Sequence, residues 1–423
     1  MSKIALVHDY FVQMGGAERV AEAMHDSFPT SPMYTTVALP QSLPKRLRLA
    51  DIRTSIMQRL PSMERRFRHY FMLYPFAVEH FDLSSYDLIF SSSSGYAKGV
   101  RRRRNAIHVC YCHTPMRWIW RYDDYVAREG FFKLVRGALP MLLWGLRKWD
   151  LRASQQPNYY IANSRLVASR IRKIYGREAF VIPPPIDVNS FHMSSDIDDY
   201  YLVLSRLMPY KRIDLAIEAC KRMNRKLIII GDGPDRARLE KLGDDRIEFL
   251  GRQSDAVVNY YAARCRALLF PGEEDFGMAP LEANAAGRPV IAYRGGGAVE
   301  TIEEGKTGIF FDQPDSRSLS AAIEKFDDAF ECVSMNQFRR ARPVRGARVV
   351  AQVDGRLGGQ PTSQLGEDRQ ATNTRVEDRD RPCVRGARHV SAERALGFCH
   401  AAATRAHRRC VARPARWVPR GWS

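Results

Sequence analysis

Two carboxylates in one short segment are the strongest candidates for chemistry in this sequence. Glu274 and Glu282 stand eight positions apart in residues 270–292, F-P-G-E-E-D-F-G-M-A-P-L-E-A-N-A-A-G-R-P-V-I-A. We expect Glu274 in a loop beyond a strand and Glu282 within the next helix, whose entrance at Gly277 leaves amides free for an anion or a sugar oxygen. The pair can accept hydroxyl donors from a sugar and a ribose, or act as acid and base. The structural alternative is capping by Glu274 with a solvated Glu282.

Two cations form a second candidate site. Arg206 and Lys211 lie in residues 202–214, L-V-L-S-R-L-M-P-Y-K-R-I-D, after a strand-like run and around a proline turn at a helix start. Both side chains can therefore meet one anion near a helix N-terminus. A diphosphate suits them, because arginine offers a planar fork and lysine a point charge. Two solvated surface cations are the alternative.

A glycine pair precedes the first helical pattern. Gly15 and Gly16 follow an apolar run and lead into a helical stripe of Val20, Met24 and Phe28. Glycines there let backbone N–H groups approach an anion at the positive end of a helix. A plain tight turn explains the pair equally well. The dinucleotide fingerprint G-x-G-x-x-G is absent from this turn.

The elements that must position these groups alternate along the chain. Short apolar, β-branched runs are followed by amphipathic helical patterns such as 212–223, 235–242, 255–264 and 316–329. Runs without polar alternation are buried on both faces, which is typical of parallel sheets covered by helices. We predict an α/β protein, with ligands at the carboxyl ends of its strands. The expected strands are 4–7, 88–91, 107–112, 159–162, 201–204, 227–230, 247–250, 267–270, 290–293 and 309–311.

Composition and a proline run indicate two domains and a tail. The length of 423 residues is too great for one core, and 45% hydrophobic with 27% charged residues describes a globular chain. Residues 181–188, V-I-P-P-P-I-D-V, exclude a helix and place the boundary near 185–198. We predict two Rossmann-like, doubly wound domains, 1–190 and 191–338, that face a cleft, with an irregular C-terminal tail at 339–423.

The tail carries most of the positive charge. Of the net charge of +19, residues 339–423 hold +12, from nineteen Arg against seven Asp plus Glu, with no Lys, Ile or Tyr. A disordered RNA-binding arm is one interpretation. We favour a frameshift or sequence error near Arg339, because arginine is scattered among Trp, Cys and Phe without any period. We therefore expect disorder past about residue 340 and no nucleic-acid partner.

Several motifs together resemble the retaining glycosyltransferases of family 4, which have the two-domain GT-B fold. Besides the segment with the two glutamates, the resemblance rests on G-G-A-E-R-V, Y-I-A-N-S, V-I-P-P-P-I-D, S-R-L-M-P-Y-K-R-I-D and I-I-I-G-D-G-P, and it covers residues 3 to about 330. It implies that the first domain binds the acceptor and the second the nucleotide sugar.

The resemblance also implies roles in donor binding. Arg206 and Lys211 would hold the diphosphate of the donor. Glu282 would accept from the ribose hydroxyls, and Glu274 would lie against the donor sugar near its 3- and 4-hydroxyls. The backbone amides of four further residues would complete this pocket: Phe276, Gly277, Met278 and Ala279.

Further residues match the family on the first domain's side. His113, in C-Y-C-H-T-P-M-R, matches the family's histidine near the reacting carbon; taken alone, a histidine at a strand end is more often a satisfied structural group. Gly15 and Gly16 would face the phosphates or the acceptor. The loop 295–300, G-G-G-A-V-E, resembles a family loop before a short helix.

The implied reaction needs neither a protein nucleophile nor a metal. The acceptor hydroxyl would attack from the face that the nucleoside diphosphate leaves, through an oxocarbenium-like pair, while Arg206 and Lys211 stabilise the departing charge. No Asp-x-Asp motif lies near the diphosphate site. The Cys110-x-Cys112-His113 run lacks a fourth ligand at finger-like spacing. We expect metal-independent transfer without a cofactor.

Substrate and location are expected from the same resemblance. M-G-G-A-E-R-V with C-H-T-P-M-R-W resembles mannosyltransferases of polysaccharide assembly, which favours GDP-mannose as donor and a glycan or polyprenyl-diphosphate-linked acceptor. Segments 65–74 and 131–149 mix bases with aromatics, so we expect a cytoplasmic enzyme with peripheral membrane contact, or else ordinary core helices with charged edges. The rival is a synthase-type enzyme that uses a UDP-sugar and a soluble acceptor.

Overall fold

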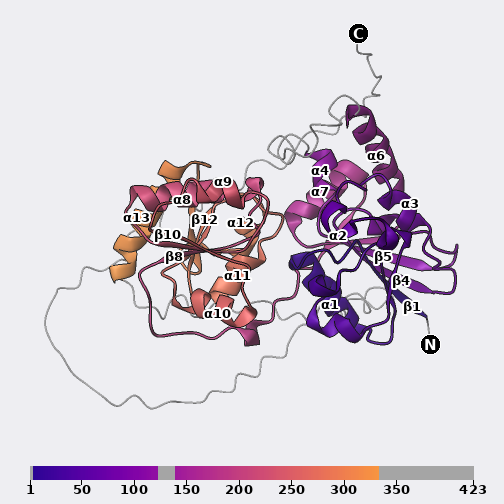
Figure 1. The fold of residues 1–423 in the computed structure, drawn as a ribbon, viewed down its shortest axis with the longest axis horizontal. Helices are drawn as coiled ribbons and strands as arrows, with labels where there is room; N and C mark the ends of the chain where they lie inside the picture. The colour runs from indigo at the N-terminus through magenta and orange to yellow at the C-terminus, as the bar shows by residue number, and fades with distance from the viewer. Residues whose placement is uncertain (1–2, 122–138, 333–423) are drawn as a thin grey trace, which may run out of the picture. The chain divides into compact units, whose positions relative to one another are not determined.

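The chain contains two parallel α/β sheets, one in each half. The computed structural model describes residues 3–121 and 139–332. The N-terminal sheet has seven strands in the order β3-β2-β1-β4-β5-β6-β7, and the C-terminal sheet has six in the order β10-β9-β8-β11-β12-β13 (Figure 1). All pairings between neighbouring strands in both sheets are parallel. The predicted pair of doubly wound, Rossmann-like sheets is confirmed.

The N-terminal sheet is covered on both faces. Its strands are β1 (Ile4–His8), β2 (Met33–Thr35), β3 (Ile52–Thr54), β4 (Leu88–Ser93), β5 (Ile107–Cys112), β6 (Tyr159–Ala162) and β7 (Ala179–Val181). Its helices are α1 (Gly16–Ser27), α2 (Met63–Arg66), α3 (Tyr74–Glu79), α4 (Arg117–Trp120), α6 (Leu139–Ala153) and α7 (Arg165–Tyr175). Alternate residues of β1 enter opposite cores, since Val7 packs with α3 and α6 while Leu6 packs with α1.

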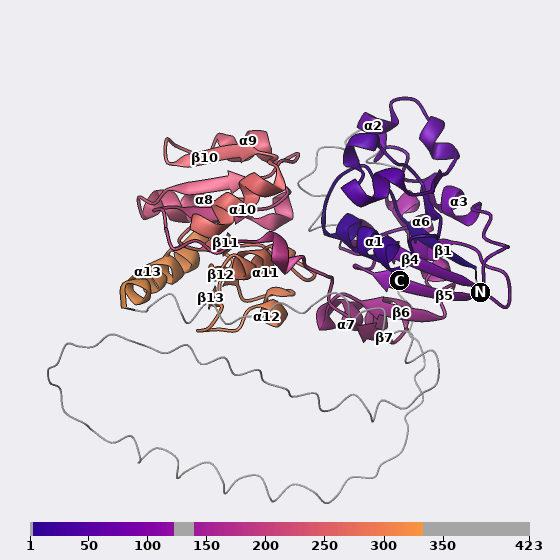
Figure 2. The ribbon, with the colours of Figure 1, turned by 90° about the horizontal axis from the view of Figure 1, so that it is seen from below.

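The C-terminal sheet follows the same plan. Its strands are β8 (Tyr201–Leu204), β9 (Leu227–Ile230), β10 (Ile247–Gly251), β11 (Leu268–Phe270), β12 (Val290–Tyr293) and β13 (Gly308–Phe311). Its helices are α8 (Ile213–Arg222), α9 (Arg236–Glu240), α10 (Asp255–Arg264), α11 (Met278–Ala285), α12 (Ala298–Thr301) and α13 (Ser316–Cys332). Helices α8 and α13 pack on one face, whereas α10 and α11 pack on the other, which places them above and below the sheet in Figure 1. Figure 2 looks onto this sheet, with its strands spread from β10 to β13.

Each sheet has a point where the strand order reverses. β1 lies between β2 and β4, and β8 lies between β9 and β11. The connections that follow the two adjacent strands at each of these points therefore lead toward opposite edges of the sheet. Loops that follow such neighbouring strands diverge and leave a crevice at their carboxyl ends. The glycine pair follows β1, the cations follow β8, and Glu274 follows β11. The strand order therefore brings the candidate residues to these edges.

The sequence patterns missed three strands. β2, β3 and β7 each contain only three residues, and in both β3 and β7 two of the three are exposed. Strands this short carry no extended apolar run, so they become strands only by pairing with an established sheet. The predictions for residues 339–423, and for the part of segment 131–149 before Leu139, lie outside the described residues.

Candidate functional site

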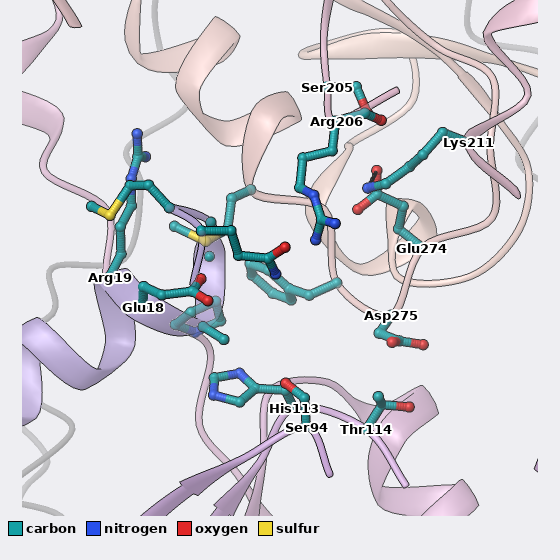
Figure 3. Close-up of a pocket in the computed structure, with 18 of the residues that line it drawn as sticks. Glu18, Arg19, Ser94, His113, Thr114, Ser205, Arg206, Lys211, Glu274 and Asp275 are labelled. Atoms are coloured by element: carbon teal, nitrogen blue, oxygen red, sulfur yellow. Dashed lines mark hydrogen bonds and ion pairs between the residues drawn. The ribbon is translucent and has the colours of Figure 1, made fainter. Parts of the chain in front are cut away.

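A pocket of about 610 Å³ collects the candidate residues (Figure 3). Loops after β1, β5, β8 and β11 and the first turns of α1 and α11 contribute to its lining. Every residue that the sequence nominated lines this pocket: Gly15, Gly16, His113, Arg206, Lys211, Glu274, Phe276, Gly277, Met278, Ala279 and Glu282. Its volume falls within the range of small-molecule sites.

The two predicted cations both reach the pocket. Arg206 follows β8, and Lys211 ends the short turn Pro209–Lys211. Figure 3 shows the charged groups of Arg206 and Lys211 on one side of the pocket. The Lys211 ammonium lies against the Glu274 carboxylate and forms an ion pair with it. Burial disfavours the ammonium, but Glu274 outweighs this cost and raises the pKa of Lys211. The site therefore holds a fully charged lysine beside an arginine.

Glu282 is buried rather than solvated. Its residue is 8% exposed, and its carboxylate forms an ion pair with Arg19 of α1. The alternative of a solvated Glu282 is therefore wrong. Arg19 was missed by sequence reasoning, because its partner lies 263 positions away; its place in G-G-A-E-R-V was the only signal.

The loop that carries Glu274 is shaped by glycines. Gly277, the N-cap of α11, has φ of +86°, and a Cβ there would lie 2.9 Å from the Phe270 ring. A side chain is therefore excluded at the helix entrance. Behind the loop, the Gly297 amide donates to the Glu274 carbonyl at 2.7 Å. The loop 295–300 thus supports the glutamate loop from outside the pocket lining.

His113 is a neutral, anchored imidazole. Its Nε2 lies 2.8 Å from Ser92 Oγ, which also lies 3.0 Å from His8 Nδ1. Burial, with a smaller contribution from His8, lowers the pKa of His113 to about 3. At neutral pH this ring can hydrogen-bond to a substrate but brings no positive charge. It is thus both structurally satisfied and part of the pocket lining.

Two acidic residues escaped the sequence reasoning. Asp9 accepts backbone N–H bonds from Ser94, Tyr96 and Ala97 at 2.5, 2.8 and 2.6 Å, which fixes the loop after β4. Glu18 lies in the first turn of α1 and is 2% exposed. Burial raises the pKa of Glu18 to about 7, although the Gly15 amide and Arg206 act in the opposite direction. The signal available in the sequence was Glu18 itself, which is the second residue after the Gly-Gly pair and the third residue of α1.

The described residues contain neither a group of metal ligands nor a membrane-spanning helix. Within residues 3–121 and 139–332, no three His, Cys, Asp or Glu side chains are grouped as a metal site would require. Cys110 and Cys112 are free and buried, and burial raises the pKa of the Cys110 thiol to about 12. Over the same ranges, no helix has both the length and the apolar character needed to cross a bilayer.

Comparison with known proteins identifies the family. Residues 14–190 match the family model described as Glycosyltransferase Family 4, and residues 191–329 match that of Glycosyl transferases group 1. The two matches adjoin and together cover residues 14–329. The chain belongs to the family 4 glycosyltransferases with the GT-B fold, as its motifs predicted.

Curated relatives and solved structures agree with this assignment. A GDP-mannose-dependent alpha-(1-6)-phosphatidylinositol monomannoside mannosyltransferase of Mycolicibacterium smegmatis is 31% identical over 38% of this chain and 50% of its own length. Human alpha-1,3/1,6-mannosyltransferase ALG2 is 26% identical over 59% of this chain and 65% of its own. The chain spans about half the length of the first curated relatives it matches.

The fold recurs in solved structures of low sequence identity. Anabaena Alr3699/HepE in complex with UDP has a TM-score of 0.61 at 18% identity, covering 85% of this chain and 100% of its own. WaaG, a glycosyltransferase involved in lipopolysaccharide biosynthesis, has a TM-score of 0.60 at 16% identity, covering 84% of this chain and 100% of its own. These likenesses establish the fold.

Proposed function

We propose that this protein is a retaining hexosyltransferase that moves a sugar from a nucleotide donor to a glycan acceptor. The observation that carries the proposal is the convergence of two cations, the buried carboxylate of Glu282 and the partly buried carboxylate of Glu274 in one pocket, opposite a neutral histidine. A nucleotide sugar presents a matching pattern, namely a dianionic diphosphate between a ribose and a hydroxyl-rich ring. The cations can bind the diphosphate, and the carboxylates can accept hydrogen bonds from the hydroxyls of the ribose and of the donor sugar.

We assign each part of the donor to different side chains of the pocket. Arg206 and Lys211 hold the diphosphate, and Glu282 accepts from the ribose hydroxyls. Glu274 accepts from the donor sugar, while the first amides of α11, which have no earlier helical partner, face the same sugar. Lys211 and Glu274 form an ion pair with each other, and the donor would add phosphate oxygens to the lysine and hydroxyls to the carboxylate.

Transfer needs stabilisation of the leaving group more than a nucleophile. The bond from the anomeric carbon to the diphosphate oxygen breaks, the acceptor oxygen attacks from the same face, and its proton passes to the departing diphosphate. Arg206 and Lys211 offset the charge that grows on this leaving group. His113, neutral at working pH, hydrogen-bonds near the reacting carbon. Because two cations already serve the diphosphate, we propose that transfer needs no divalent metal.

GDP-mannose is the proposed donor. Two relatives are named as mannosyltransferases, and one of these names specifies GDP-mannose. A UDP-sugar donor is the second candidate, since a probable sucrose-phosphate synthase of Thermosipho melanesiensis is 31% identical over 38% of this chain and 42% of its own length. The two candidates differ in base and sugar but share the diphosphate site.

For the acceptor, we propose a lipid-linked glycan approached from an anionic membrane surface. Helices α3 and α6 lie together, because Trp149 Nε1 donates to Glu79 Oε1 at 2.6 Å. They expose Phe76, Met141 and Trp144 at 57%, 69% and 58%. Lys148 lies 3.6 Å over the Trp144 ring, so a base accompanies the aromatic group. The opposite face of α6 is buried in the core. The alternative of an ordinary core helix with charged edges therefore explains the buried face but not the exposed aromatic face.

Release of nucleoside diphosphate tests the function directly. The full-length protein is incubated with GDP-mannose, UDP-glucose and UDP-N-acetylglucosamine in turn, with membrane lipid extract as acceptor. GDP released only from GDP-mannose, with mannose appearing in the lipid fraction, is expected. UDP release with a soluble acceptor supports the synthase alternative, and no release from any donor contradicts the proposal.

A further inference from the structure

The loop between β11 and α11 is bound by arginines from the N-terminal half of the chain. Arg117 Nη2, from the first turn of α4, lies 2.6 Å from Asp275 Oδ1, and Arg170 of α7 forms an ion pair with the same oxygen. Arg170 also contacts Glu273 at 3.0 Å, as does Arg121. The residues before and after Glu274 are thus both ion-paired, while Glu274 itself turns to Lys211.

Backbone bonds reinforce the same junction. Ser164 Oγ, at the N-cap of α7, donates to the Asp275 carbonyl at 2.6 Å. Glu300 of α12 accepts the backbone amides of Arg165 and Leu166 at 2.8 and 3.0 Å, which satisfies the first turn of α7 from the other half of the chain. The α7 N-terminus and the glutamate loop are therefore held together by side chains from both halves.

These ion pairs are shielded from solvent. The side chains of Arg117, Arg170 and Asp275 are 13%, 16% and 16% exposed. Burial would raise the pKa of Asp275, but Arg117 and Arg170 outweigh it and lower that pKa. The aspartate therefore stays ionised at neutral pH. The Arg117 guanidinium also lies 4.6 Å from the centre of the Tyr210 ring, next to Lys211. One arginine thus contacts both segments that carry the Lys211–Glu274 pair.

We infer that Asp275 is a positioning residue for the donor sugar. Its contacts with Arg117 and Arg170 orient the adjacent Glu274, so the sugar-binding carboxylate is correctly placed only while the loop touches α4 and α7. The inference rests on the proposed function for its catalytic consequence alone. Of the side chains assigned to the nucleotide, Arg206 and Glu282 lie outside these contacts, whereas Lys211 meets them through Glu274. Loss of Asp275 should consequently impair sugar transfer while leaving nucleotide affinity nearly unchanged.

Asp275→Asn in the full chain separates positioning from general destabilisation. With the best donor, we expect kcat to fall about tenfold or more, while the Kd values of GDP and UDP from calorimetry change by less than about threefold. The control is Asp312→Asn, which removes an exposed aspartate paired with Arg294 and should change neither quantity. Unchanged kcat in Asp275→Asn, or an equal loss of nucleotide affinity and turnover, overturns the inference.

Hydrogen exchange tests the same point without relying on activity. Amides 272–278 should exchange at least about fivefold faster in Asp275→Asn, whereas amides 227–230 of β9 stay protected.

In a double-mutant cycle, adding Arg117→Gln should cause little further change, because the two residues share one contact. The inference is contradicted if amides 272–278 exchange at the wild-type rate in Asp275→Asn. It is also contradicted if the effects of Asp275→Asn and Arg117→Gln are independent, so that the double variant shows their full product. If Asp275→Asn does not fold, Arg170→Lys replaces it, since lysine keeps the charge but lacks the two guanidinium nitrogens that contact Asp275 and Glu273. An inactive wild type with the expected exchange pattern refutes the proposed transfer reaction alone.

Discussion

The ammonium of Lys211 and the carboxylate of Glu274 form an ion pair in the pocket, with side chains only 13% and 19% exposed. Under the proposed function, each group has a second partner on the donor: a phosphate for the lysine and a sugar hydroxyl for the glutamate. The pair therefore holds the cation and the acceptor group in place before the donor arrives, which reduces the cost of ordering them on binding.

Replacing Lys211 by alanine should lower kcat/KM by roughly 100-fold or more, because one of two charges on the leaving diphosphate is lost. Product formation and a melting curve are measured together, so that loss of fold is detected. Lys306→Ala is the matched control, since Lys306 is 70% exposed and pairs only with Glu303 among the recorded ion pairs of the described residues. Full activity in Lys211→Ala would remove this residue from the site.

Replacing Glu282 by glutamine should raise the Kd of the nucleoside diphosphate by about tenfold or more, because a neutral amide binds ribose hydroxyls more weakly than a carboxylate. The change also leaves Arg19 without its anionic partner. Calorimetry with GDP and UDP measures the effect, and Glu304→Gln, at an exposed surface pair with Arg294, is the control. Affinity equal to that of wild type would argue against ribose binding by Glu282.

Transfer should continue in excess EDTA. Arg206 and Lys211 both line the pocket and can offset the diphosphate charge in place of a divalent ion. The initial rate is compared before and after chelation, and again after addition of magnesium or manganese. A rate that collapses with EDTA and returns only with a divalent metal would refute metal independence.

Glu18 should make stability depend on pH in a defined direction. Its pKa of about 7 in the folded chain exceeds the ordinary 4.5, so the folded state binds more protons between these values, and the contribution of Glu18 to stability falls as pH rises from 4.5 to 7. Glu18→Gln should therefore gain stability relative to wild type, by up to roughly 3 kcal/mol, at about 1.4 kcal/mol per pH unit.

Melting temperatures of Glu18→Gln and wild type at pH 5 and pH 8 measure this effect. The difference between the two proteins should shift in favour of the variant at pH 8. Glu324→Gln, at an exposed position of α13, should show no such shift. A difference that is the same at both pH values would mean that Glu18 does not titrate in this range.

Membrane binding should depend on α6. Trp144→Ser should reduce sedimentation with vesicles that contain anionic lipid by about fivefold or more, because an exposed aromatic group with an adjacent lysine is lost. Tyr260→Ser on α10 removes an aromatic residue of similar exposure, 55%, and should leave sedimentation unchanged. Equal binding by Trp144→Ser and wild type would contradict contact through this helix.

The local sequence determined most of the strands and their alternation with helices, although not the short strands β2, β3 and β7. Buried strands such as Leu227–Ile230 are continuous apolar runs, and Gly277 followed by Pro280 marks a helix entrance where Glu274 and Glu282 fall on opposite sides. These features arise from short-range sterics and periodicity, so neighbouring residues suffice to recognise them. The motifs were specific enough to indicate the family, and the family comparison confirmed it.

Only the tertiary structure decided which charges meet. Arg19 pairs with Glu282 across 263 positions, and Arg170 with Asp275 across 105. Asp9 accepts hydrogen bonds from amides some 85 positions away, and burial is the main cause of the raised pKa of Glu18. A charged residue looks the same in sequence whether solvent or a distant partner surrounds it. Its partner and its pKa follow from strand order and packing, which bring remote loops to one pocket.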